Sequence, residues 1–109
     1  MQYPPRETVK ALLDYNPSTG VFTWRHRDRS WFTTDRSYKV FKTRDAGKEA
    51  GNQRTNAKGH RSVRIRLLGR NYFAHRLAWL YMTDEPLPKE IDHKNANGWD
   101  NRWENIRNG

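Results

Sequence analysis

A strict alternation of polar and apolar residues at positions 62–67 constrains the fold more than any other stretch of this sequence. Ser or Arg alternates there with Val, Ile or Leu. Because successive side chains of a β-strand point to opposite faces, this period of two places every apolar residue on one face. Residues 68–70 supply a turn, and residues 71–74 return along the first strand. The stretch therefore predicts a β-hairpin with Arg64 and Arg66 on the face opposite the core.

Two helices and a further strand are predicted around this hairpin. Residues 6–15 have apolar side chains at helical spacing, and residues 75–82 have helical composition. Residues 16–20 are expected to make a turn, and residues 21–25 a strand. Together these elements predict an α+β domain. The apolar residues expected to face its core are Val9, Leu12, Leu13 and Tyr15 from the first helix, and Leu77, Leu80 and either Tyr81 or Ala78 from the second.

The chain length allows one domain. Its 109 residues contain no internal repeat, so they are expected to form a single domain with a modest core. Within residues 1–109 we distinguish an N-terminal helix and strand (1–25), a basic loop and hairpin (26–70), and a C-terminal site region (71–109).

The composition excludes several classes of protein. No cysteine is present, which rules out disulfides and thiolate zinc sites and fits a reducing cytosol. No apolar run approaches the roughly 20 residues that a membrane-spanning helix needs, and the start of the chain lacks the apolar core of a signal peptide. We therefore expect a soluble, cytoplasmic protein with no membrane partner.

The positive charge is concentrated in the middle of the chain. The net charge is +9, and residues 26–70 account for all of it with thirteen basic and four acidic residues. Residues 71–109 hold five basic and six acidic residues. Such a division suits a phosphodiesterase, in which cations hold the polyanion and carboxylates hold a metal. A basic surface that only keeps the protein in solution is the alternative.

Residues 26–59 show no clear period, and we predict a long loop or irregular β excursion there. Such a loop is uncommon in a small domain unless it binds something. Its interleaved cations and aromatic rings could follow a phosphate backbone and stack on bases, although each ring taken alone is expected to pack on the core. The hairpin arginines either contact phosphates or serve as solubilising charges. The residues predicted to contact nucleic acid are Arg36, Lys39, Lys42, Arg44, Lys48, Arg64 and Arg66.

The acidic end carries the residues with catalytic chemistry. Asp92 offers a hard oxygen ligand for a divalent cation. The adjacent His93 has a side chain whose ordinary pKa, roughly 6.5, suits a general base near neutral pH. An adjacent carboxylate and imidazole supply half of a hydrolytic site.

The residues around this Asp-His pair predict its local structure. Residues 83–89, with two prolines, are expected to form a rigid extended link into a strand at residues 90–93. Neighbouring strand residues point to opposite faces, so the pair can act together only if the strand ends or bulges there. A turn at residues 95–98, rich in Asn and Gly, permits this. A short helix capped by Asp100 or Asn101 is expected to follow.

This stretch resembles the motif of the HNH endonucleases, specifically the small phage type related to intron-encoded homing endonucleases. The resemblance rests on Asp-His, the turn of Asn and Gly, and Asp-Asn-Arg-x-Glu-Asn-Ile-Arg within residues 91–107. Residues 13–24 and 72–80 look like the lead-in segments of the same family. The resemblance implies that the α+β domain ends in a compact ββα metal unit.

The resemblance also assigns roles to individual residues. Asp92 would bind a divalent metal such as Mg²⁺, His93 would be the general base, and Asn105 would brace the active-site loop. The family's last ligand, a His or Asn on a closing helix, has no counterpart, because the chain ends four residues after Asn105 and Asn108 has the wrong spacing. Metal binding is therefore expected to be weak and completed by water and substrate. Structural roles near the site are expected for Asn95, Asn101 and His75. For His75, the alternative is a role as a metal ligand or a contact with phosphate.

Two functions follow from these features. The first is a metal-dependent, phage-type HNH endonuclease that hydrolyses phosphodiester bonds, with duplex DNA as its partner. The second is a catalytically incomplete HNH-derived protein that binds nucleic acid or a nucleoprotein complex, for example to inhibit a host defence system in a phage-infected bacterial cell. A purely structural phage protein explains the basic segment poorly. No oligomeric state is predicted.

Overall fold

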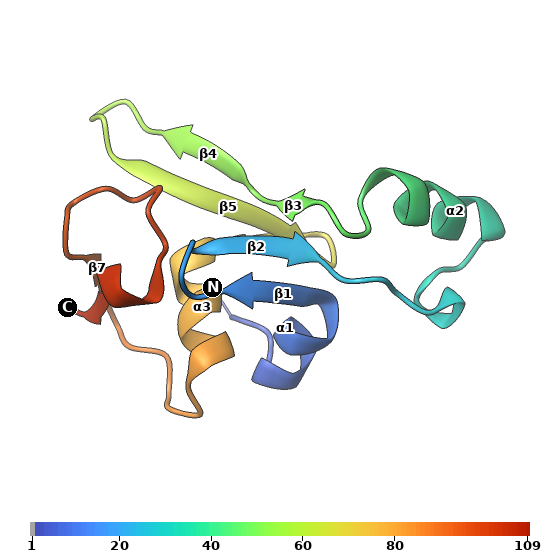
Figure 1. Ribbon diagram of the computed structural model, residues 1–109, viewed down its shortest axis with the longest axis horizontal. Helices are drawn as coiled ribbons and strands as arrows, with labels where there is room; N and C mark the ends of the chain where they lie inside the picture. Colours follow the sequence, from blue (N-terminus) through green and yellow to red (C-terminus); the bar gives the residue numbers. More distant parts are fainter. Residues whose placement is uncertain (1) are drawn as a thin grey trace.

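Three small antiparallel sheets and three α-helices make up the computed structural model, which describes residues 2–109 (Figure 1). The predicted α+β class is confirmed. The sheets have the strand orders β1-β2-β3, β4-β5-β6 and β7-β8. The elements are α1 (Arg6–Leu12), β1 (Leu13–Asn16), β2 (Val21–Trp24), the 3₁₀ turn η1 (Arg29–Trp31), α2 (Asp35–Arg44), β3 (Glu49–Ala50), β4 (Asn52–Thr55), β5 (Arg61–Leu67), β6 (Arg70–Phe73), α3 (Ala74–Met82), β7 (Ile91–His93), the 3₁₀ turn η2 (Trp103–Asn105) and β8 (Ile106–Asn108).

The hairpin of β5 and β6 has the faces that its alternation predicts. Its two-residue turn consists of Leu68 and Gly69, whose φ angles are 50° and 81°. Positive φ at both positions gives the tight turn whose twist matches that of the paired strands. Ile65 is fully buried, whereas Arg64 and Arg66 are exposed on the opposite face. β4 pairs with the other edge of β5 and makes the hairpin a three-stranded sheet.

The first helix is shorter than predicted. α1 ends at Leu12, so the prediction of a helix through residue 15 is wrong. Leu13 and Tyr15 are buried while the residues that follow each of them are exposed, which is the period of a strand. Antiparallel pairing of β1 with β2 supplies backbone partners for this segment. Tertiary pairing therefore outweighs the local helical spacing.

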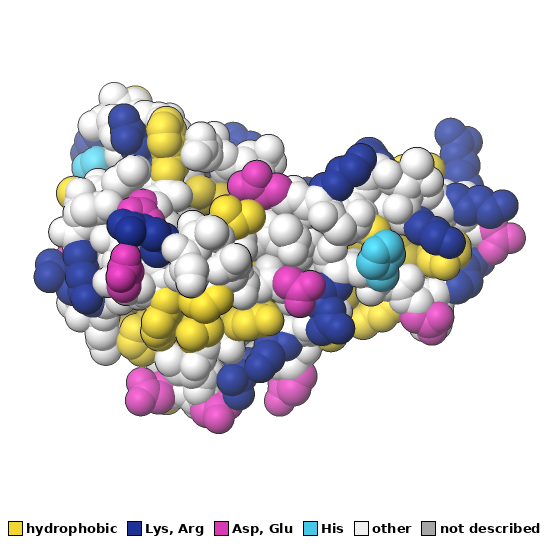
Figure 2. All heavy atoms as spheres, viewed as in Figure 1, with side chains coloured by type: hydrophobic (Ala, Val, Ile, Leu, Met, Phe, Trp, Pro, Cys, Tyr) yellow, Lys and Arg dark blue, Asp and Glu magenta, His cyan; other side chains and the backbone are white. Residues whose placement is uncertain are grey.

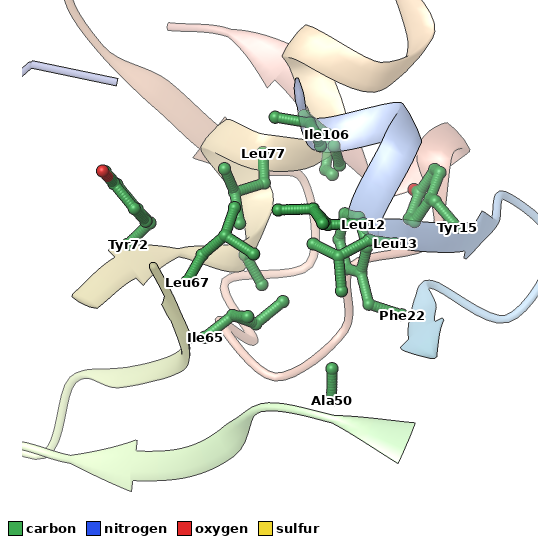
Figure 3. Packing of buried hydrophobic residues seen from close by; sticks show 13 residues of the cluster. Leu12, Leu13, Tyr15, Phe22, Ala50, Ile65, Leu67, Tyr72, Leu77 and Ile106 are labelled. Carbon is green, nitrogen blue, oxygen red and sulfur yellow. The ribbon is translucent and has the colours of Figure 1, made fainter. Parts of the chain in front are cut away.

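One hydrophobic core joins α1 and α3 to the two larger sheets. Figure 3 shows Leu12, Ile65 and Leu77 pointing toward one another from three different elements. Ile106 of β8 reaches the same cluster, which anchors the C-terminal region to the rest of the fold. The fully buried large side chains are Val9, Leu12, Leu13, Ile65, Leu67 and Leu77.

Residues 25–48, which we call the arm, project from this core. The prediction of an irregular segment is wrong, because the arm contains η1 and the ten-residue α2 and the chain after it forms β3 and β4. Thr34 caps α2, since its Oγ1 accepts a hydrogen bond of 3.1 Å from the backbone N–H of Ser37. Figure 1 shows α2 at the end of the molecule opposite β7. No helix within residues 2–109 is long and apolar enough to cross a lipid bilayer.

A small aromatic cluster holds the arm together. Phe41 of α2 is 8% exposed, and its ring centroid lies 5.6 Å from that of Phe32 and 6.3 Å from that of Trp24. The guanidinium of Arg27 lies 4.4 Å from the Phe41 ring centroid, in a cation–π contact. Since Trp24 ends β2, the cluster connects α2 to the first sheet. Burial lowers the pKa of Arg27.

Phe41→Ala should melt α2 while the body of the protein stays folded. Truncating a buried Phe removes about 3–5 kcal/mol of packing, which exceeds what a helix this short gains without tertiary contacts. Hydrogen exchange is expected to show lost protection for amides of α2 and unchanged protection in β5. Val40→Ala is the matched control, because Val40 lies on the same helix and is 42% exposed. Equal protection of α2 in the two variants would contradict the assignment of Phe41 as the anchor.

Candidate active site

The loop between His93 and Asn105 is held by the side chain of Asn105. This residue is 4% exposed, and its Oδ1 accepts a hydrogen bond of 3.0 Å from the backbone N–H of Asn95. Its Nδ2 donates to Oδ1 of Asn95 at 2.9 Å and to the carbonyl oxygen of Asp100 at 2.8 Å. Its own carbonyl oxygen accepts from the N–H of Lys94 at 2.8 Å. One buried amide therefore ties the start of the loop to its end.

The strands β7 and β8 close this loop at its base. The prediction of a short helix capped by Asp100 or Asn101 is wrong, because a single 3₁₀ turn leads directly into β8. Pairing of β8 with β7 buries Ile106, and both expected caps have other partners: Asp100 bonds to Arg102, and Asn101 faces the His93 ring. β7 and β8 are the two strands of the expected ββα unit, and no helix follows them within residues 2–109.

The His93 ring is oriented by Asn101. Its Nε2 lies 2.8 Å from Oδ1 of Asn101, a residue that is only 2% exposed. Because an amide oxygen can only accept, Nε2 donates the proton and Nδ1 keeps the lone pair. Asn101 is itself fixed, since its carbonyl oxygen accepts a hydrogen bond of 2.6 Å from Tyr15. Nδ1 is therefore the nitrogen of His93 that can accept a proton.

His75 packs against this ring. Its ring meets that of His93 edge-on, with centroids 4.9 Å apart, and stacks on Phe73 at 5.6 Å. Nδ1 of His75 is buried without a hydrogen-bond partner among residues 2–109. Burial lowers the pKa of His75 to about 4, with the neighbouring His93 as the next cause. His75 is therefore a neutral packing partner of His93 at pH 7.

Asp92 is paired with a cation of the protein itself. Arg107 lies opposite it in the β7-β8 pairing and donates from Nε at 3.1 Å and from Nη2 at 2.8 Å, both to Oδ2. Hydrogen bonding from Arg107 is the main cause that lowers the pKa of the Asp92 carboxyl. Within the described residues no three His, Asp or Glu side chains converge as a metal site. A hard divalent cation at Asp92 would therefore have this one carboxylate, already bonded to Arg107, and would take its further oxygens from water and substrate.

Two surface cavities open beside these residues, and His60 and Asp92 line both. One is also lined by His93 and Asn95, and the other by His75. His60 precedes β5, so its place at the site results from the fold. No spacing in the sequence connects it to the Asp-His motif, and it was not among the predicted site residues.

The site loop rests on the second sheet and on the N-terminal hairpin through close backbone contacts. A Cβ atom at Gly98 would lie 1.8 Å from the carbonyl oxygen of Arg61, and one at Gly20 would lie 2.3 Å from the backbone nitrogen of Arg102. Trp99 also donates from its indole nitrogen to the carbonyl oxygen of residue 54 at 3.1 Å. Only glycine permits these two approaches. The loop is therefore clamped between segments that are far apart in the chain.

The residues predicted to contact nucleic acid lie in two places on the fold. Arg64 and Arg66 share the outer face of β5, and the other five belong to α2 or to the segment after it. Arg44 is paired with Asp45 at 2.9 Å. Figure 2 shows basic side chains gathered at the free end of the arm, opposite the end that carries the site loop in Figure 1. The fold thus separates the basic arm from the Asp-His pair.

Asn105→Ala should destabilise the protein by about 1–3 kcal/mol, because the loop groups that its amide satisfies would be left buried without partners. Urea unfolding at neutral pH measures this difference. Asn108→Ala is the matched control, since Asn108 is exposed on the adjacent strand and its side chain makes no hydrogen bond to residues 2–109. A loss in Asn105→Ala no larger than that in the control would show that the loop does not depend on this amide.

Stability should fall as the pH decreases from about 6.5 to about 4, because the unfolded His75 binds a proton in this range and the folded one does not. The expected loss from this residue is up to ~3 kcal/mol. His75→Phe keeps a ring against Phe73 and removes the titrating group, so its stability should depend less on pH in this window. Urea unfolding of both proteins at several pH values tests this. Parallel pH profiles would contradict burial of a neutral His75.

Comparisons with known proteins find a likeness in sequence for part of the chain and in fold for nearly all of it. Residues 72–109 match the family model described as HNH endonuclease. The fold is similar to that of the HNH homing endonuclease I-HmuI, whose solved structure concerns DNA binding and cleavage. The TM-score is 0.53 and the sequence identity is 16%. The match covers 98% of this chain and 51% of that chain, so this chain spans about half the length of the homing endonuclease. A search of curated proteins finds no match.

The fold likeness extends over nearly the whole chain, whereas the sequence match is confined to the C-terminal region. That region contains Asp92, His93 and Asn105, which are the residues that the β7-β8 hairpin and its loop bring together. Residues 72–109 are thus similar in sequence to the HNH endonuclease model, and the fold of nearly the whole chain is similar to that of an HNH homing endonuclease.

Proposed function

We propose that this chain is a metal-dependent HNH endonuclease that hydrolyses phosphodiester bonds in duplex DNA. The observation that carries the proposal is the pairing of His93 with buried Asn101, which leaves Nδ1 as the basic nitrogen beside Asp92. β7 ends at His93, so the two neighbouring side chains are not confined to opposite faces of a continuing strand. A phage source and action in the cytoplasm of an infected bacterial cell belong to the same proposal and rest on the motif.

The residues of the site have separate roles in this proposal. A hard divalent cation held by Asp92 would supply positive charge at a non-bridging phosphate oxygen and at the leaving 3′ oxygen. Nδ1 of His93 takes a proton from the attacking water, whose oxygen bonds to phosphorus as the bond to the 3′ oxygen breaks. Asn101 keeps the ring in the required tautomer, and Asn105 keeps the loop in place.

Two observations support duplex DNA as the substrate. All of the net positive charge lies in residues 26–70, which include the arm and the outer face of β5. The molecule is 43 Å long, a length that corresponds to about a dozen base pairs at roughly 3.4 Å each. The related fold of I-HmuI, an enzyme studied for DNA binding and cleavage, points the same way. In this proposal the arm contacts phosphates at a distance from the bond that is cut.

A second candidate function is a protein that binds nucleic acid, or a nucleoprotein complex such as a host defence system, without cutting. The observation that favours it is the state of Asp92, whose carboxylate is bonded to Arg107 and belongs to no group of three His, Asp or Glu side chains that could hold a metal among the described residues. Such a protein would keep the basic arm and the folded loop but would not hold a metal well enough for hydrolysis.

Plasmid incubation with Mg²⁺ or Mn²⁺ separates the two candidates. The endonuclease is expected to nick or cut slowly, at metal concentrations on the order of millimolar because one carboxylate binds such ions weakly. His93→Ala and Asp92→Ala should both abolish cleavage while leaving the thermal melting transition in place, and EDTA should stop the parent. Cleavage by His93→Ala at the parental rate would refute the assignment of His93 as the base.

The binding half of the proposal is tested on the same proteins by fluorescence anisotropy with duplex DNA at several salt concentrations. Reversing Arg64 and Arg66 to Glu should weaken binding and reduce the salt slope, by about 0.9 for each lost phosphate contact. Reversing Lys10 of α1, an exposed lysine outside the basic segment and outside the site loop, is the control, and its effect is compared with that of Arg64→Glu alone so that the changes of charge are equal. Salt-sensitive binding without cleavage, unaffected by Asp92→Ala, would select the second candidate.

A further inference from the structure

The ion pair between Asp92 and Arg107 is built into the β7-β8 hairpin. The two residues are directly paired across the strands, so their side chains project from the same face. Two nitrogens of the guanidinium, Nε and Nη2, contact the same carboxylate oxygen at 3.1 and 2.8 Å. The side chains are 51% and 56% exposed, so ions from solvent can reach the pair.

The guanidinium occupies part of the space in which a cation could contact this oxygen. An arginine keeps its charge at any pH at which the protein is folded, so it cannot leave the carboxylate by losing a proton. A divalent ion at Oδ2 would meet both the occupied space and the positive charge of Arg107. An ion at Oδ1, which makes no hydrogen bond to Arg107, would still lie close to this positive charge, so binding of the ion and retention of the ion pair oppose one another.

Within residues 2–109, Asp92 is the only carboxylate with which Arg107 forms an ion pair. The nearby Asp100 is already bonded to Arg102 and Asn95, and the Arg102 guanidinium is the main cause that lowers its pKa to about 2. In the described part of the chain Arg107 is therefore ion-paired with Asp92, and Asp100 is ion-paired with Arg102.

We propose that Arg107 is an internal competitor of the divalent cation at Asp92, so that metal binds Asp92 more tightly when the Asp92–Arg107 pair opens. The inference rests on the proposed function for the role of Asp92 as metal ligand. It makes the weak metal affinity expected of a single-carboxylate site weaker still in the absence of substrate. Removing Arg107 should therefore increase metal affinity, although it removes a residue from the site.

Mn²⁺ binding to the DNA-free protein, followed by electron paramagnetic resonance, tests the competition without any measurement of cleavage. Arg107→Gln should bind Mn²⁺ about fivefold more tightly than the parent, as expected for release of an exposed ion pair. Lys94→Gln is the matched control, because Lys94 is exposed, lies two residues from Asp92 and forms no ion pair in the described part of the chain. Its affinity should change less than about twofold, since a solvated charge acts only through screened fields.

The double variant Asp92→Asn with Arg107→Gln shows whether the increase in Mn²⁺ affinity depends on Asp92. The increase should be absent from this variant. Equal affinities of Arg107→Gln and Lys94→Gln, or a gain that survives in the double variant, would overturn the proposal. A measurement on the parent protein avoids any folding defect of the variants. When Mg²⁺ is added and the protein is followed by NMR, the Arg107 Nε–H resonance should shift as the pair opens. A resonance that stays unchanged at saturating Mg²⁺ would overturn the proposal too.

These results are independent of whether the protein cuts DNA. A protein that never cleaves can still show the competition, and a protein that cleaves with unchanged metal affinity in Arg107→Gln refutes only the role of Arg107. Failure of Asp92→Asn alone to lower Mn²⁺ binding would instead count against Asp92 as the ligand, and so against the proposed function itself.

Discussion

The hydrogen bonds of the Asn105 side chain are the constraint on which the candidate site depends. Its amide is buried and bonded to both Asn95 and the carbonyl oxygen of Asp100. A displacement of the loop would break several of these bonds at once and leave polar groups buried without partners, which costs more than each bond contributes on its own. Ile106, the residue after Asn105, is buried in the core. Asn105 therefore cannot move with the loop. The position of His93 therefore depends on the buried residues Asn105 and Ile106.

This constraint needs the whole fold, because the loop is supported by segments far from it in sequence. Gly98 rests on the backbone of Arg61, and Gly20 on the backbone of residues 101 and 102. Tyr15 reaches the carbonyl oxygen of Asn101, the residue that orients the His93 ring. The N-terminal hairpin is thus part of the scaffold for the site, which accounts for a fold likeness that spans nearly the entire chain. The arm, in contrast, depends on its own aromatic cluster and places its charges away from the site.

Elements whose stability comes from neighbours in space were the ones that sequence reasoning misjudged. The β5-β6 hairpin was predicted with its correct faces, because strict alternation and a turn with glycine are local signals. β1 and β8 were expected to be helical, yet both are strands that pair with partners contributed by other parts of the chain. α2 was missed because only Phe41 and the half-buried Tyr38 pack on its covered side, so its sequence has little apolar periodicity.

The sequence by itself determined the chemistry available at the site: the adjacent Asp92 and His93, the asparagine at position 105 and the basic middle segment can be read from it directly. These are matters of residue type and short spacing. Only the tertiary structure decided how those residues are used, because strand pairing places Arg107 against Asp92 and loop packing turns Asn101 toward His93. Contacts of this kind depend on which backbone segments lie side by side, and that is a property of the folded chain as a whole.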